Sequence, residues 1–176
     1  MSLRPIILIS ITVALAACSK PRIENLTPAV TDGSYTANDG AAIVSAIVIT
    51  KDSHNDLSTY VLTTYKCKDL TTTRFSSGGV VFSSTASSVP TPSFRELNTG
   101  CDIETSAKAT SSDEVRVDIK INGVAQNPSF LKKTDTPSAL AKVHSSLNSS
   151  DKVEIEEESC HAAFNHSCED LNLVSR

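Results

Sequence analysis

The densest group of reactive side chains lies near the C-terminus, where two cysteines and two histidines fall close together: Cys160, His161, His166 and Cys168. Thiolates and imidazoles bind Zn²⁺ and Cu⁺, so a metal site is one interpretation. Cys160 and His161 are adjacent, however, and adjacent side chains diverge in a helix or a strand. We therefore expect a disulfide between the two cysteines. Metal or small-ligand binding that uses His161 and His166 is the alternative.

Other patterns that support catalysis or cofactor binding are missing from the sequence. It contains no G-x-S-x-G motif and no glycine-rich phosphate loop. His54 lies beside Asp52 and Asp56 in a polar stretch, which is a common chance arrangement. Acidic side chains near the C-terminus lack the spacing of a calcium loop and indicate a solvated face; they are Glu154, Glu156, Glu157, Glu158, Glu169 and Asp170. We expect neither an enzyme nor a bound cofactor.

The N-terminus carries the most specific pattern of the chain. Arg4 is followed by an apolar run, Ile6 to Ala14, and then by Leu15-Ala16-Ala17-Cys18. This order of a basic residue, a short apolar segment, small residues and a cysteine resembles the signal peptide and lipobox of bacterial lipoproteins. Residues 6–17 are too few to cross a bilayer, which needs about twenty apolar residues.

The resemblance implies cleavage before Cys18 and lipidation of its thiol and amine. More than one acyl chain makes a stable membrane anchor. Ser19, rather than an aspartate, follows the cysteine, which favours the outer membrane. The expected organisation is a signal peptide over residues 1–17, a lipidated flexible tether over 18–40 and one globular domain over 41–176.

The remaining cysteines are even in number, which indicates disulfides in an exported protein. Three connectivities are possible for four cysteines. We favour Cys67–Cys101 and Cys160–Cys168, because these pairs are closest in the chain. The formal charge of −4 becomes more negative without Arg4, so nucleic acid is not an expected partner.

Hydrophobic periodicity predicts a mainly β domain. Residues 41–50 are apolar and rich in β-branched side chains, which indicates a buried central strand, and residues 58–66 indicate the returning strand. Two short strands are expected at 74–75 and 80–82, on either side of Gly78-Gly79, followed by an exposed loop over 83–93.

A hairpin is expected next, because residues 101–107 and 114–122 both alternate between apolar and polar side chains. Ile103 can share a face with Ile119 or Ile121 only if the connection holds an odd number of residues, three or five. In that register Cys101 points inward, where it can meet Cys67. Asn122-Gly123 indicates a tight turn, and Pro128 keeps any following strand short.

One clear helix is expected to begin at Thr136-Pro137, with Thr136 as its cap and with Leu140, Val143 and Leu147 on one face. Residues 152–156 alternate again and indicate a strand. Together these elements predict a disulfide-supported, antiparallel β-sandwich of about seven strands with one or two packed helices.

The expected function follows from the anchor and from the lack of catalytic groups. The chain is expected to be an envelope lipoprotein that presents a small β domain to another protein, as an accessory subunit of a secretion, conjugation or surface structure. The charged face of residues 114–120, or a sheet edge, is the expected contact surface.

Overall fold

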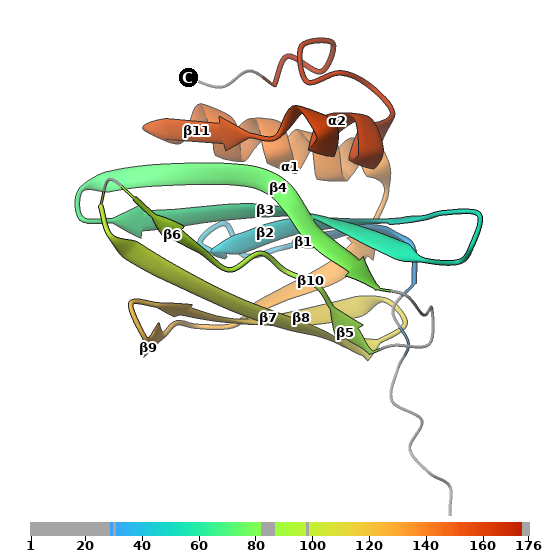
Figure 1. Cartoon of the computed structure of the whole chain (residues 1–176), viewed down its shortest axis with the longest axis horizontal. Helices are drawn as coiled ribbons and strands as arrows, with labels where there is room; N and C mark the ends of the chain where they lie inside the picture. Colours follow the sequence, from blue (N-terminus) through green and yellow to red (C-terminus); the bar gives the residue numbers. More distant parts are fainter. Residues whose placement is uncertain (1–28, 30, 82–86, 98, 174–176) are drawn as a thin grey trace, which may run out of the picture.

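The computed structural model describes residue 29 and residues 31–81, 87–97 and 99–173 (Figure 1). The predicted signal peptide, Cys18 and the tether up to residue 28 lie outside these residues. The described elements are β1 (Gly33–Ala37), β2 (Val44–Lys51), β3 (Leu57–Cys67), β4 (Leu70–Val81), β5 (Ser88–Val89), β6 (Phe94–Glu96), β7 (Cys101–Ser111), β8 (Glu114–Ile121), β9 (Val124–Ala125), β10 (Ser129–Thr134), α1 (Thr136–Asn148), β11 (Lys152–Ile155) and α2 (Glu157–Phe164).

The strands form one curled sheet rather than the expected sandwich of about seven strands. Its order is β11-β4-β3-β2-β1-β10-β8-β7-β5, with β6 paired to β7 and β9 paired to β8. The described pairs are antiparallel except β11 with β4, which is parallel. Curling brings the inner faces of the two halves together, so the single sheet encloses a core as two separate sheets would (Figure 1).

The interior of the curl is filled by aliphatic side chains from both halves of the sheet. Ile47 and Val61 come from one half, and Val117, Ile119 and Leu131 come from the other. All five side chains are buried. The alternation of residues 114–121 places Val115, Val117 and Ile119 in this core, as the sequence predicts.

A helical layer lies on the outer face of β2, β3 and β4, which we call the covered half of the sheet (Figure 1). Val48, Leu62 and Phe75 point outward from these strands and pack against α1, α2 and β11. The Phe75 ring stacks on Phe164 of α2, with 5.7 Å between centroids. β2 is therefore buried on both faces over most of its length, which explains why apolar side chains occupy both of its faces.

The start of α1 corrects the expected cap. Asp135, not Thr136, is the N-cap residue: its backbone is extended, and its carboxylate accepts a hydrogen bond from the Ser138 backbone N–H at 2.7 Å. Thr136 and Pro137 instead occupy the first turn, where the missing N–H of proline is tolerated. Val143 and Leu147 are buried as predicted.

Residues 70–81 form one long strand rather than two short ones. The β3–β4 register shifts opposite Gly79, whose φ is +121°, so the glycine pair marks a bulge and not a turn. A Cβ at Gly78 would lie 2.5 Å from the Pro90 carbonyl oxygen. Glycine is required there because the segment between β5 and β6 crosses the strand closely.

The C-terminal part of the predicted tether is also corrected. β1 lies inside the sheet between β2 and β10, and its Tyr35 is buried. The strand is only five residues long and begins with glycine, so its alternation is too short to stand out from the polar sequence around it. The globular domain therefore begins before residue 41.

The β7–β8 hairpin and the first disulfide follow the prediction. Ile103 pairs with Ile121, and Ala109 pairs with Val115, in the predicted register. The turn itself holds two residues, 112 and 113, rather than the expected three or five, and a bulge between Ala109 and Ser111 supplies the extra residue. Cys101 is buried and bonded to Cys67, with the Cα atoms 6.3 Å apart. No helix among the described residues is both long and apolar enough to cross a membrane.

Candidate functional site

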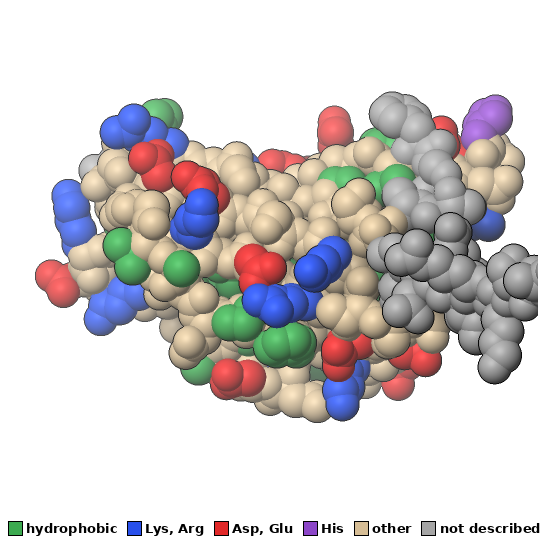
Figure 2. All heavy atoms as spheres, turned by 90° about the horizontal axis from the view of Figure 1, so that it is seen from below, with side chains coloured by type: hydrophobic (Ala, Val, Ile, Leu, Met, Phe, Trp, Pro, Cys, Tyr) green, Lys and Arg blue, Asp and Glu red, His purple; other side chains and the backbone are tan. Residues whose placement is uncertain are grey.

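No helix of the described part of the chain covers the outer face of β7, β8 and β10, which we call the open half of the sheet (Figure 1). Its outward side chains are largely charged, and Figure 2 shows basic, acidic and hydrophobic groups interspersed on the underside of the molecule. They are Glu104, Ser106 and Lys108 on β7, Glu114, Arg116, Asp118 and Lys120 on β8, and Phe130 and Lys132 on β10.

Phe130 is the unusual side chain on this face. It is opposite Arg116 in the β8–β10 pairing, and Arg116 is opposite Lys108 in the β7–β8 pairing, so these three form one row across the strands. Phe130 is 49% exposed. The Arg116 guanidinium lies 5.8 Å from the centre of its ring, and it also donates to the Asp118 carboxylate at 2.6 Å. An aromatic ring held among charges in this way is typical of a contact residue.

The charged side chains of residues 114–120 therefore lie on the outer face, as their alternation predicts, and their contact with a partner stays a prediction. Sequence reasoning missed Phe130. β10 was overlooked because Pro128 immediately precedes it and because only Phe130 and Leu131 are apolar within it. Its pairing with both β8 and β1 is a long-range feature that no local pattern reports.

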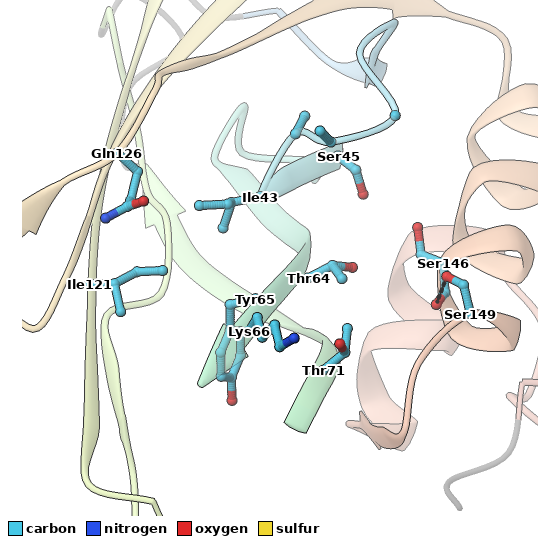
Figure 3. A pocket seen from close by; sticks show the side chains of 13 residues that line it. Ile43, Ser45, Thr64, Tyr65, Lys66, Thr71, Ile121, Gln126, Ser146 and Ser149 are labelled. Carbon is cyan, nitrogen blue, oxygen red and sulfur yellow. Dashed lines mark hydrogen bonds between the residues drawn. The ribbon is translucent and has the colours of Figure 1, made fainter. Parts of the chain in front are cut away.

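A second candidate site is a cavity of about 360 Å³ at the end of the curl (Figure 3). It lies where the β1–β2 connection and the end of β3 meet residues of β8 and the last turns of α1. Ile43 and Ile121 form an apolar wall. The opposite wall carries hydroxyl groups, and Figure 3 shows the side chains of Ser45, Thr64 and Ser146 pointing toward one another.

A β-bulge places Ser45 in this wall. The β2–β3 register shifts between Val44 and Ala46, so Ser45 leaves the regular alternation of β2. Its side chain is buried, and its hydroxyl has no hydrogen-bond partner among the described residues. Neighbouring hydroxyls are satisfied: Thr64 bonds Thr73, and Ser149 donates to the Ser146 carbonyl.

A third candidate site is a polar cluster that connects the short strand β6 to the covered half of the sheet. The Glu96 carboxylate is 6% exposed, accepts a hydrogen bond from the Tyr65 hydroxyl at 2.9 Å, and pairs with the Lys152 ammonium at 2.9 Å. Lys152 also pairs with Glu154 at 2.7 Å. Arg74 completes the cluster by contacting Glu154 at 3.4 Å.

The electrostatic balance of this cluster is that of a structural ion pair. Hydrogen bonding from Lys152 lowers the pKa of Glu96 against the opposing effect of burial. Hydrogen bonds to Glu154 and Glu96 raise the pKa of Lys152. Burial, together with the bond to Glu96, raises the pKa of Tyr65. These pKa shifts keep Glu96 charged, Lys152 charged and Tyr65 neutral near neutral pH, which suits a cluster that stabilises β6.

The cysteine–histidine segment forms a disulfide-linked helix. Cys160 lies on α2 and is bonded to Cys168, with 5.2 Å between their Cα atoms. His161 is exposed on the same helix, 4.0 Å from Glu157, and His166 is exposed beyond it. The structure therefore does not bring the two histidines and two thiolates together. Among the described residues, no group of three potential metal-binding side chains occurs.

The other residues that the sequence singled out lie in different parts of the molecule. Cys18 lies outside the described part of the chain. His54 is exposed on the β2–β3 turn beside Asp52. The acidic residues near the C-terminus are dispersed: Glu156 contacts Arg74, and Glu157 accepts from the Cys168 backbone N–H.

Comparisons of the chain with protein-family models, with curated proteins and with solved structures gave no match.

Proposed function

We propose that the chain is a lipid-anchored envelope lipoprotein whose β domain binds another protein through the open half of its sheet. The anchor is the lipidated Cys18, in the outer membrane, and the partner belongs to a secretion, conjugation or surface assembly. The proposed activity is binding, with no chemical step catalysed by the domain.

The observation that carries this proposal is the half-exposed Phe130 in its row of charged side chains. The outer face of the covered half shows how this fold buries apolar groups when it has a covering layer of its own. On the open half the ring is left in water, at a cost in hydrophobic free energy that a partner would recover. Arg116 and Lys108 beside it favour a partner that brings acidic groups to the rim of the contact.

Two experiments test the two parts of the proposal separately. Mass spectrometry of the N-terminus of the protein isolated from its own membranes should find a diacylglyceryl group on Cys18. An unmodified Cys18, or a mature chain that begins elsewhere, refutes the anchor.

For the binding surface, a photo-crosslinking amino acid replaces Phe130 in the full chain, and Lys142, a partly exposed residue of α1, serves as the control position. We expect a discrete crosslinked product at position 130 and none at 142. Equal labelling at both positions, or none at 130, refutes the open half as the contact surface.

A further inference from the structure

We infer that the cavity beside Ser45 binds a small, neutral, hydroxyl-rich molecule of monosaccharide size. This inference is independent of the lipid anchor and of the partner proposed for the open half, because the cavity lies at the end of the curl and shares no residue with the Phe130 row (Figure 3).

The first step is the unpaired hydroxyl. Ser45 is one of the residues that line the cavity and is 3% exposed, and its Oγ atom has no hydrogen-bond partner among the described residues. Buried hydroxyls in folded proteins are almost always hydrogen-bonded, because leaving one unpaired costs free energy. A hydroxyl can both donate and accept, so a ligand hydroxyl in the cavity would satisfy it in either role.

The second step is the division of the cavity into two walls. Ser45 and Thr64 from the strands and Ser146 from α1 converge on one side, whereas Ile43 and Ile121 form the other (Figure 3). A ring that carries hydroxyl groups at its edge and C–H groups on its face matches this division. The volume of about 360 Å³ is at the small end of the range for ligand pockets, which suits one such ring.

The third step is the charge of the lining. Among the described residues that line the cavity there is no carboxylate to bind an ammonium group or a metal ion. Lys66 is the only charged residue in this described lining and is exposed, which is too little for a tightly held anion. The Tyr65 ring is buried and its hydroxyl is committed to Glu96, so no open aromatic face is offered to a planar base. A neutral polyol remains as the best chemical match.

The chain offers a matched pair of variants for the test. Ser45→Ala removes the unpaired hydroxyl inside the cavity. Thr63→Val removes the other buried hydroxyl that lacks a partner among the described residues, and Thr63 does not line the cavity. Both substitutions delete one unpaired polar group, so both should leave the thermal midpoint of unfolding unchanged or higher.

The experiment titrates the purified full chain with D-glucose, D-galactose, N-acetylglucosamine and glycerol, and with inorganic phosphate as the charged probe, while amide NMR shifts are followed. We expect saturable shifts at Ile43, Thr64 and Ser146 with at least one sugar, weakened about tenfold or more by Ser45→Ala and unchanged by Thr63→Val.

Three outcomes overturn the inference. One is the absence of saturable binding by any sugar or by glycerol up to tens of millimolar. Another is equal binding by wild type and Ser45→Ala. A third is saturable binding of phosphate alone, which would identify an anion site at Lys66. A lower unfolding midpoint for Ser45→Ala without sugar binding would show that an ordered water holds the hydroxyl, and it also counts against a ligand site.

Discussion

Phe75 and Phe130 both point outward from the same curled sheet, yet their surroundings are opposite. Phe75, in the covered half, is fully buried and stacks on Phe164, whereas Phe130, in the open half, is half exposed beside Arg116. The sequences of the strands report the difference: β2 is apolar on both faces, and β8 alternates strictly. One sheet thus holds an outer face that a helical layer covers and an outer face that stays exposed among the described residues.

The largest expected effect sharpens this contrast directly. Phe75→Ala should lower the free energy of unfolding by about 3–5 kcal/mol, because it leaves a cavity beneath α2. Phe130→Ala should change it by less than about 0.5 kcal/mol, since the ring is half in water. Urea unfolding of both variants measures the difference. Similar losses would mean that the open half is packed as a structural face.

The two disulfides differ in the same way, because one joins the two halves and the other lies within the helical layer. Replacing both Cys67 and Cys101 by alanine should lower the free energy of unfolding by about 4 kcal/mol, because the disulfide closes a separation of 34 residues. Replacing both Cys160 and Cys168 should lower it by about 2.5 kcal/mol, because the separation is only 8 residues. Urea midpoints of the two double variants rank them. The reverse order would show that the helical layer depends on its own link more than the curl does.

Glu96→Gln should lower the free energy of unfolding by about 2 kcal/mol at neutral pH, because Lys152 and the Tyr65 hydroxyl lose their charged partner. The pKa of Glu96 is lowered from 4.5, so its contribution is present above pH 4.5 and disappears as the pH falls below that value. The pKa of Lys152 is raised from 10.5, so its contribution is present below pH 10.5 and disappears at higher pH.

Wild type should therefore lose stability at both extremes of pH, and Glu96→Gln should lose less than wild type on the acid side. Thermal unfolding followed across pH 3 to 12 checks both losses. Parallel curves for the two proteins would remove Glu96 from the connection between β6 and the covered half.

The smallest effect concerns the start of the helical layer. Asp135→Ala should lower the thermal midpoint slightly, because the Ser138 backbone N–H loses its acceptor. Thr136→Ala is the matched control and should change the midpoint less, since Thr136 lies in the first turn. Circular dichroism on heating measures both. A larger effect at Thr136 would restore the cap that the sequence alone suggests.

Much of the strand content could be predicted from local periodicity, and the favoured disulfide pairs agree with the structure. The register of the β7–β8 hairpin could be predicted because apolar and polar side chains alternate in both strands, and only one register places the apolar side chains on the same face. β1 and β10 were not accessible, because each is short and their mutual pairing joins residues about a hundred positions apart, which no local pattern can report. The same pairing turns an expected sandwich into one curled sheet.

The candidate sites also differ in whether a local sequence pattern predicts them. The charged face of β8 follows from alternation within one strand, so the sequence locates it. Phe130 lies on β10, a strand that the local sequence pattern does not predict. The Ser45 cavity depends on a bulge that places Ser45 where β2, β3 and α1 meet. Their chemistry comes from residues distant in sequence, and serine and threonine are too common to stand out individually.

The parallel pairing of β11 with β4 has a consequence for truncated forms of the chain. The outward apolar side chains of β2, β3 and β4 come early in the sequence, whereas the segments that cover them, α1, β11 and α2, come late. A chain that ends before residue 143 therefore leaves these apolar side chains in water. Holding chaperones should bind such truncated products and release the full-length polypeptide.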